Sequence, residues 1–156
     1  MPTTYDTPLA TAVTFRAGHQ RYALPIERVR EIQKIVAFSD VPDENAMVIG
    51  MVDVRGEIVP VVDVRSLLGL PVQPYSLETP MVVVSSTSGP VALVVDAVDA
   101  IAEMRADGAG TVPEMHSLAS RVLGVHRIAE ELVFLLDIDR LLEPVDVPGG
   151  RVECDD

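Results

Sequence analysis

The chain carries an internal sequence repeat with a period near 70 residues. Several apolar positions recur at an offset of 69 residues: Ala23/Ala92, Leu24/Leu93, Val29/Val98 and Ile32/Ile101. At an offset of 74 residues, the segment 48–50 recurs as 122–124 and the segment 57–68 recurs as 131–142. A repeat of this length is too long for a solenoid unit and is about the size of a small β-barrel. We therefore predict two pseudo-equivalent barrels joined side by side, with the repeat boundary near residues 72–80 and a groove between the barrels as the natural place for function.

The composition favours a mainly β protein. Apolar residues make up 48% of the chain but aromatic residues only 4%, so Val, Leu, Ile and Ala must form the core. Many of these side chains are β-branched, which favours strands. The clearest hairpin joins residues 50–54 to 57–62 through the turn Arg55-Gly56. The runs 81–85 and 91–95 are almost continuously apolar, which is typical of strands buried on both faces.

Charge and cysteine content exclude several classes of ligand and location. The net charge is −12, from 24 acidic and 12 basic side chains, which argues against nucleic acid because phosphate binding needs a basic face. The single cysteine, Cys154, can form no intramolecular disulfide, so a reducing cytoplasm is expected. No run approaches the ~20 apolar residues of a membrane helix, and the N-terminus lacks a signal-peptide pattern. We expect no membrane insertion, a flexible arm over residues 1–11 and a disordered acidic tail over residues 145–156.

Two aspartates and three glycines are predicted to have structural roles. Asp63 and Asp137 each precede a short apolar run, as expected for the N-cap of a helix. Paired aspartates in duplicated barrels also suggest an aspartic protease, but such enzymes need Asp-Thr/Ser-Gly loops, which neither site has. Gly50 and Gly124 recur at strand starts and indicate a bulge or close backbone approach. Gly56 serves the hairpin turn.

No pattern in the chain predicts catalysis, a metal site or a cofactor. The three histidines, His19, His116 and His126, are far apart and have no metal-ligand spacing. There is no P-loop, no dinucleotide fingerprint and no nucleophile elbow. An enzyme built on duplicated barrels is therefore disfavoured, because nucleophile, base and oxyanion donors cannot be assembled from these residues.

Three blocks of sequence, taken in order, resemble the CheW family of bacterial chemosensory adaptors. The first and longest block spans residues 50–71, from Gly50-Met-Val-Asp-Val-Arg-Gly56 to Leu68-Gly-Leu-Pro71. The second is Val95-Asp-Ala-Val98, and the third is Leu135-Leu-Asp-Ile-Asp-Arg-Leu-Leu142. The similarity covers about residues 12–144, nearly the whole chain. The family has Asn where this chain has Asp53, and Asp cannot donate a hydrogen bond as an amide does, so turn bonding or a partner contact is expected to differ there.

This resemblance implies two intertwined SH3-like β-barrel subdomains and a non-enzymatic scaffold function. Such adaptors hold the cytoplasmic tip of a chemoreceptor and the regulatory domain of the histidine kinase CheA in one geometry, at receptor arrays. A receptor tip is a helical hairpin, so its docking would place a helix in a groove. An adaptor of the same fold serving another motility pathway, or binding receptor without kinase, remains an alternative.

Candidate partner-binding residues follow from the resemblance and from the duplication. Arg55 matches the family's turn arginine and is expected to contact receptor or kinase, although a solvated turn residue is the plain alternative. Glu31 is expected either to pair with Arg55 and orient the turn or to contact the receptor. The groove is predicted to be lined by apolar side chains that could equally belong to the core: Val29, Ile32, Ile26, Val98 and, as a weaker candidate, Val13.

Overall fold

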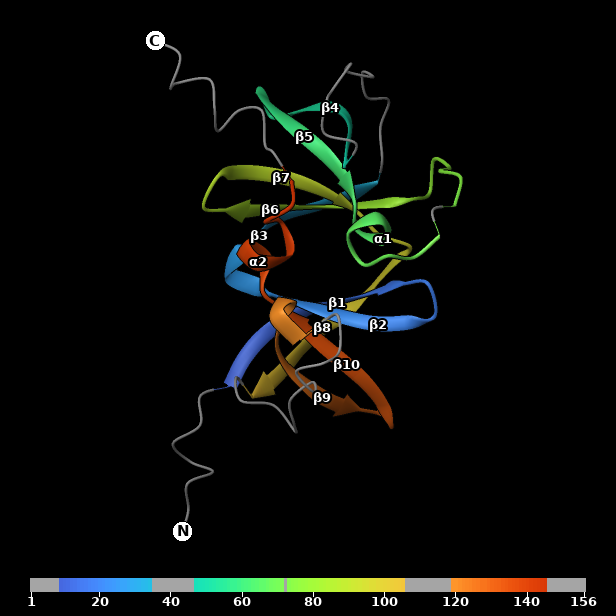
Figure 1. Ribbon diagram of the computed structural model, residues 1–156, viewed down its shortest axis with the longest axis vertical. Helices are drawn as coiled ribbons and strands as arrows, with labels where there is room; N and C mark the ends of the chain where they lie inside the picture. The colour runs from blue at the N-terminus through green and yellow to red at the C-terminus, as the bar shows by residue number, and fades with distance from the viewer. Residues whose placement is uncertain (1–8, 35–46, 72, 106–118, 146–156) are drawn as a thin grey trace.

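The computed structural model describes residues 9–34, 47–71, 73–105 and 119–145 (Figure 1). Within these residues, ten strands form two five-stranded sheets, so the prediction of a mainly β fold is confirmed. Sheet A consists, in spatial order, of β8 (Ala97–Arg105), β1 (Leu9–Ala17), β2 (Gln20–Pro25), β10 (Glu131–Leu136) and β9 (Val122–Ile128). Sheet B consists of β3 (Val29–Lys34), β6 (Pro80–Ser86), β7 (Gly89–Val94), β5 (Glu57–Asp63) and β4 (Val48–Val54).

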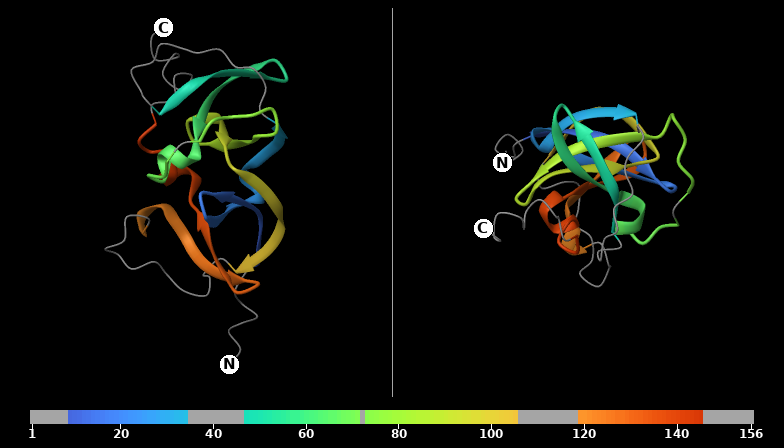
Figure 2. Two further views of the ribbon diagram at one scale, coloured as in Figure 1. Left: turned by 90° about the vertical axis from the view of Figure 1, so that its right-hand side faces the viewer. Right: turned by 90° about the horizontal axis from the view of Figure 1, so that it is seen from above.

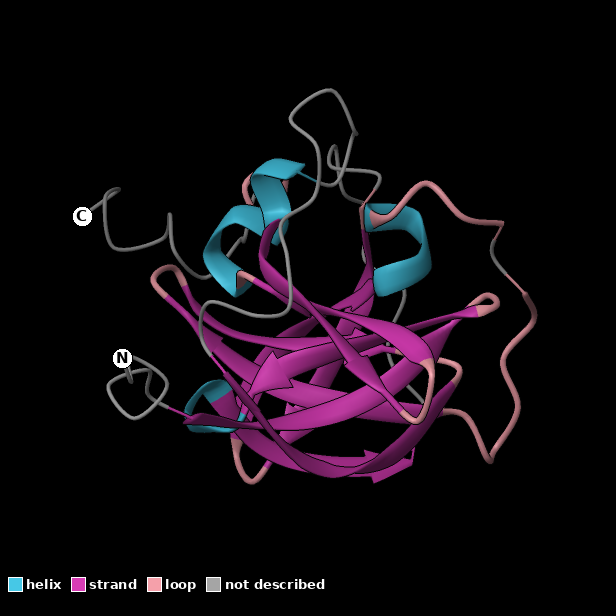
Figure 3. Cartoon of the chain, turned by 90° about the horizontal axis from the view of Figure 1, so that it is seen from below, coloured by secondary structure: helices cyan, strands magenta, loops and turns pink. Residues whose placement is uncertain are grey.

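Four short helices connect the strands within the described residues. They are η2 (Ile26–Arg28), α1 (Val64–Leu67), η3 (Ala119–Arg121) and α2 (Ile138–Leu141). The two sheets follow one another along the longest axis of the molecule, with sheet B above sheet A in Figures 1 and 2. The view from below shows the short helices at the periphery of the strands (Figure 3). None of the helices among the described residues is long and apolar enough to cross a membrane.

Neither sheet is built from one repeat alone. Sheet A combines β1 and β2 of the first repeat with β8, β9 and β10 of the second, and sheet B combines the complementary strands. The parallel pairings β2–β10 and β5–β7 each join strands of different repeats. The chain crosses from sheet A to sheet B at η2 and returns between β7 and β8. The two repeats are therefore intertwined in space.

The apolar side chains form three clusters. One cluster lies in sheet A around Met104, Val133 and Leu135, and a second lies in sheet B around Val59 and Met81. The largest cluster takes residues from both sheets and from helices α1 and α2. Alternation along β6 explains this division: Met81 and Val83 join the sheet B cluster, whereas Val82 and Val84 join the shared one. β6 and β7 are buried on both faces from Met81 to Val84 and from Val91 to Val94, which confirms the sequence prediction.

The ordered domain is slightly longer at each end than predicted. Strand β1 begins at Leu9, where Leu9 pairs with Arg105 and Ala10 with Met104, so residues 9–11 belong to the sheet and not to an arm. Val145 is 8% exposed and packs in the shared core cluster, so it belongs to the domain and not to the tail. The rest of the predicted arm and tail, residues 1–8 and 146–156, lies outside the described residues.

Candidate functional site

An open groove of about 420 Å³ lies where the edge strands of the two sheets approach each other. Strand β3 of sheet B forms one wall. The connector that leads into β6 forms the second wall, and the corner between β7 and β8 forms the third. The lining residues are Ile32, Gln33 and Lys34 on β3, Glu78 and Pro80 on the connector side, and Asp96, Ala97 and Val98 at the corner. Most of the accessible lining is apolar, which suits a protein partner with an apolar ridge.

Two of the five predicted groove residues line this groove. Ile32 and Val98 face it from opposite sheets, and Ile32 is 43% exposed. Val29 is half-buried, pairs with Val84 in sheet B and packs against the shared core cluster. Ile26 lies in η2, where the chain crosses between the sheets, and is also half-buried. Neither Val29 nor Ile26 is among the residues that line the groove.

The expectation that Val13 lines the groove is wrong. Val13 is 1% exposed because β1 is an interior strand of sheet A, paired with β2 on one side and β8 on the other. Its neighbours Ala12, Thr14 and Phe15 are also almost fully buried. Both faces of β1 are covered at this point, so Val13 contributes to packing and offers no surface to a partner.

The hairpin turn between β4 and β5 places Arg55 in solvent. Arg55 and Gly56 both have positive φ, 53° and 87°, as in the two-residue turn whose twist matches that of antiparallel strands. The Arg55 side chain is 82% exposed, and its Nε donates a hydrogen bond to Glu31 Oε2 over 3.0 Å. This confirms the predicted pairing of Glu31 with Arg55. An exposed pair of this kind stabilises the fold by only ~0–1 kcal/mol, so its main effect is to orient the arginine.

Asp53 supports this turn as a hydrogen-bond acceptor. Its Oδ1 accepts from the backbone N–H of Gly56 over 2.8 Å. Asp and Asn can both accept this bond, so the turn keeps its geometry with the carboxylate. The carboxylate therefore adds a negative charge beside Arg55 without disturbing the local backbone.

Strand β3 connects the groove to the Arg55-Gly56 turn, which we call the arginine turn. Glu31 and Ile32 are consecutive residues of this strand, and consecutive side chains of a strand point to opposite faces. Glu31 reaches Arg55, whereas Ile32 lines the groove. The edge strand β3 therefore contributes adjacent residues to the groove and to the contact that orients Arg55.

The predicted structural glycines and aspartates have the expected roles. The register of β4 against β5 shifts between Val48 and Gly50, and the register of β9 against β10 shifts at the equivalent place between Val122 and Gly124. These repeated β-bulges confirm the prediction for Gly50 and Gly124. Asp63 caps α1 by accepting from the Arg65 N–H at 2.9 Å. Asp137 caps α2 by accepting from the Arg140 N–H at 3.3 Å, so both predicted caps are confirmed.

Sequence reasoning missed a buried charge network behind the groove. Arg65 is only 3% exposed, and its guanidinium contacts Asp63, Asp96 and the ring of Tyr75. The hydrogen bonds that its guanidinium donates to Asp63 and the attraction of both carboxylates raise the pKa of Arg65, against the effect of burial. Burial and a hydrogen bond to Asp63 raise the pKa of Tyr75 to about 12. The pattern Asp63-Val-Arg65 was visible in the sequence, but its partner Asp96 lies 31 residues further along the chain.

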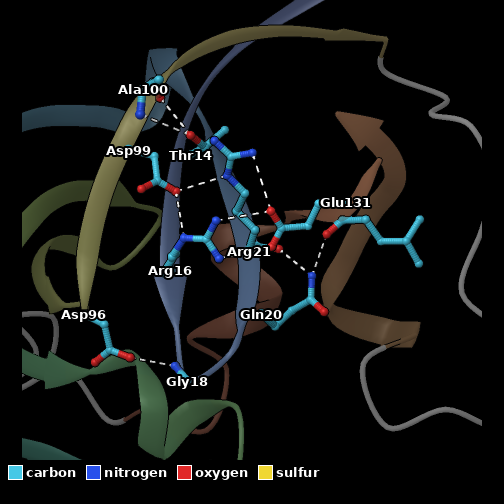
Figure 4. Close-up of polar contacts among 10 residues, drawn as sticks. Thr14, Arg16, Gly18, Gln20, Arg21, Asp96, Asp99, Ala100 and Glu131 are labelled. Carbon is cyan, nitrogen blue, oxygen red and sulfur yellow. Dashed lines mark hydrogen bonds and ion pairs between the residues drawn. The ribbon is translucent and has the colours of Figure 1, made fainter. Parts of the chain in front are cut away.

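A second charge network joins four strands of sheet A (Figure 4). Arg16 donates to both carboxylate oxygens of Glu131, at 3.1 and 3.2 Å, and lies 3.5 Å from Asp99. Arg21 donates to Asp99 at 3.0 Å and lies 3.8 Å from Glu131. These four residues come from β1, β2, β8 and β10, so the network joins strands of both repeats. The hydrogen bonds from Arg16 to Glu131 also raise the pKa of Arg16.

No metal centre accompanies these features in the part of the chain that the structure describes. No group of three or more His, Cys, Asp or Glu side chains is placed there to hold a metal ion. The two repeated aspartates are occupied as helix caps and lie in separate sites.

Comparison with known proteins decides the family. The model of the CheW-like domain matches residues 11–145. The chain belongs to the CheW family. It is similar to the chemotaxis protein CheW of Rhizobium meliloti (strain 1021), with 29% identity over 129 residues that cover 81% of this chain and 83% of that protein. It is also 29% identical over 133 residues to the chemotaxis protein CheW of Klebsiella aerogenes, covering 82% of this chain and 78% of that protein.

The CheW-family fold is also seen in a solved structure. The scaffolding protein CheW from Thermoanaerobacter tengcongensis superposes with a TM-score of 0.78 and 22% sequence identity, over 87% of this chain and 94% of that chain. This likeness, with the two five-stranded sheets, confirms the prediction of two SH3-like subdomains. The CheW-family match also confirms the resemblance seen in the sequence blocks.

Proposed function

We propose that this chain is a non-enzymatic scaffold that couples chemoreceptors to the histidine kinase CheA at receptor arrays. The observation that carries the proposal is the open groove with Ile32 and Val98 on opposite walls. A receptor tip is a helical hairpin, and an amphipathic helix binds by placing its apolar face in such a groove. The chain needs no reaction for this role, because holding two partners in a defined geometry is sufficient for coupling.

The arginine turn is the surface we assign to the kinase. Arg55 is 82% exposed and is oriented by Glu31, the strand neighbour of the groove residue Ile32. Arginine is enriched among the residues that dominate binding energy at interfaces. Two surfaces connected through one edge strand suit an adaptor that contacts receptor and kinase at the same time.

Binding of two purified partners tests the proposal. The partners are a soluble fragment spanning a chemoreceptor tip and the CheA regulatory domain, both encoded in the same genome, titrated by calorimetry. Arg55→Ala should weaken the kinase complex by about tenfold, the size of an interface residue worth more than 1 kcal/mol. Its melting temperature should stay within a few degrees of wild type, because the Arg55–Glu31 pair is exposed.

Val98→Asp should weaken receptor binding in the folded fraction and leave the kinase complex unchanged. Val98 is half-buried against the shared core, so the folded fraction is measured by circular dichroism before each titration. Wild-type protein that binds neither partner would refute the coupling function. Unaltered receptor affinity of folded Val98→Asp would refute the groove assignment.

A scaffold that binds receptor without engaging kinase is the second candidate. Asp53 favours it, because a carboxylate at the base of the turn places a negative charge beside Arg55 where the resemblance to the family predicts a neutral amide. Kinase binding by the variant Asp53→Asn distinguishes the two candidate functions. If the wild type binds only the receptor fragment and Asp53→Asn gains kinase binding, the second candidate holds.

A further inference from the structure

One buried guanidinium holds two of the three groove walls. Arg65 itself does not line the groove, and its side chain is only 4% exposed. Its Nη1 donates to Asp96 Oδ1 over 2.9 Å, and Asp96 begins the corner that continues to Val98. Its Nη2 donates to the backbone carbonyl of Gln73 over 3.2 Å, and Gln73 lies in the connector that continues to Glu78. Both walls are therefore attached to the same side chain.

Further contacts fix this guanidinium in place. Nε and Nη2 donate to the two oxygens of Asp63, at 2.9 and 2.7 Å, which makes a two-pronged pair. The hydroxyl of Tyr75, another connector residue, donates to Asp63 Oδ2 over 2.7 Å, and the Tyr75 ring lies 5.6 Å from Arg65 Cζ. The α1 cap, the connector and Arg65 thus form one packed unit.

Asp96 is held from two sides. Its Oδ1 accepts from Arg65, and its Oδ2 accepts from the backbone N–H of Gly18 over 2.6 Å, the contact drawn in Figure 4. Gly18 belongs to the turn between β1 and β2 of sheet A, whereas Arg65 follows a strand of sheet B. Asp96 therefore ties the corner that carries Val98 to both sheets.

The other half of the molecule contains a related ion pair, in which an acid occupies the position of the arginine. Asp139 occupies the position equivalent to Arg65, and its partner is Arg28, whose Nη2 donates to Asp139 Oδ2 over 2.6 Å. Asp139 Oδ1 accepts from the Thr87 N–H, and Thr87 is the repeat equivalent of Gly18. None of these residues lines the groove. We call Arg65 with its contacts to Asp96 and Gln73 the Arg65 clasp, and Asp139 with its contacts to Arg28 and Thr87 the Asp139 clasp. The Asp139 clasp is a control within the same chain.

We propose that Arg65 is a positioning residue for partner binding, because it sets the separation of the connector wall and the Val98 wall. This inference rests on the proposed function of the groove. A surface that is already held in its binding shape loses less conformational entropy when a helix docks. The affinity for the partner therefore depends on the Arg65 clasp, although Arg65 itself does not touch the partner. The Asp139 clasp stabilises the fold without this effect on binding.

Hydrogen exchange tests the positioning without any partner. Wild type, Arg65→Lys, Asp96→Asn and Asp139→Asn are compared by mass spectrometry at neutral pH. Lysine keeps the charge but lacks the planar fork that reaches several acceptors, and Asp96→Asn leaves the Asp63 cap intact. In Arg65→Lys and in Asp96→Asn, the backbone amides of residues 73–80 and 96–98 should exchange at least about tenfold faster than in the wild type. Asp139→Asn should leave these segments at wild-type rates, and unchanged exchange in Arg65→Lys and Asp96→Asn overturns the proposal.

A double-mutant cycle against the receptor-tip fragment tests the effect on binding. Arg65→Lys and Asp96→Asn should each weaken binding about three- to tenfold. This is only a fraction of the free energy of a hydrogen bond between charged groups, because the contact supports the site and is not made with the partner. The double variant should lose less affinity than the sum of the two single losses, because the two changes share the Arg65–Asp96 contact. Additive losses would mean that Asp96 contacts the partner directly, and unchanged affinities would mean that the clasp has no role; either result overturns the proposal. If the wild type does not bind the fragment, the proposed function fails and the exchange measurement alone decides the positioning.

Discussion

Ile32 offers the sharpest test of the groove, because the repeat supplies its own control. Ile32 lies on β3 and Ile101 occupies the equivalent position on β8. Both are exposed, to 43% and 66%, and only Ile32 lines the groove. Each lies on the edge strand of its sheet. Truncation of each to alanine therefore removes the same atoms from the same kind of strand, and only one change removes groove surface.

The expected loss follows from the exposed fraction of Ile32. Complete burial of an isoleucine side chain is worth about 1.5–3 kcal/mol. A partner that covers the 43% still exposed would gain about 0.6–1.3 kcal/mol, which is about a three- to ninefold change in the dissociation constant. Alanine retains the β-carbon, so these values are upper limits for Ile32→Ala.

Titration calorimetry with the receptor-tip fragment measures both variants. Ile32→Ala should weaken binding within this range, and Ile101→Ala should bind as the wild type does. Thermal unfolding of both variants controls for loss of structure, and Ile32→Ala should lower the melting temperature more than Ile101→Ala because more of its side chain is already buried in the free protein. A larger effect at Ile101 than at Ile32 would refute the reasoning and would place the partner on the outer side of β8.

Two further predictions concern stability. Gly56→Ala should lower the free energy of unfolding by about 1–2 kcal/mol and the melting temperature by about 2–8 °C, because φ is +87° while no atom lies within 4 Å of the added β-carbon. Calorimetric unfolding that matches wild type would show that the turn rearranges. Hydrogen bonds from Arg28 and the Thr87 N–H hold the pKa of Asp139 below its usual range, so the folded state binds this proton less readily than the unfolded chain. The resulting stability is present above about pH 4 and is lost as the pH falls further through the folded-state pKa. In urea unfolding, the difference between wild type and Asp139→Asn should therefore shrink below about pH 4, and a constant difference down to pH 2 would contradict this assignment.

Local features of the site were predictable because short-range chemistry determines them. An Asp before a short apolar run caps a helix whatever surrounds it, and Asp63 and Asp137 both do so. The Arg55-Gly56 pair between two apolar runs specifies a tight hairpin, and both residues take the positive φ that such a turn requires. The bulges at Gly50 and Gly124 follow the same logic.

Burial and long-range pairing were less predictable. Val13 and Ile32 are both apolar residues in strands, yet one is 1% and the other 43% exposed. The difference is that β1 lies inside its sheet and β3 at an edge, which strand order decides. Ile32 and Val98 were predicted for the groove, but Glu78 and Asp96 were not, because charged residues in a connector and a corner carry no periodic signal.

By itself, the sequence determined that this protein is a duplicated, mainly β member of a recognisable family, because repeat spacing and apolar alternation reflect local backbone geometry. Only the tertiary structure decided which strands the repeats exchange, so that sheet A takes β8, β9 and β10 from the second repeat and sheet B takes β3, β4 and β5 from the first. That exchange brings β3 and β8 together at the groove and sets Arg65 against Asp96. Contacts between residues far apart in sequence depend on how the whole chain closes, and no single segment carries that information.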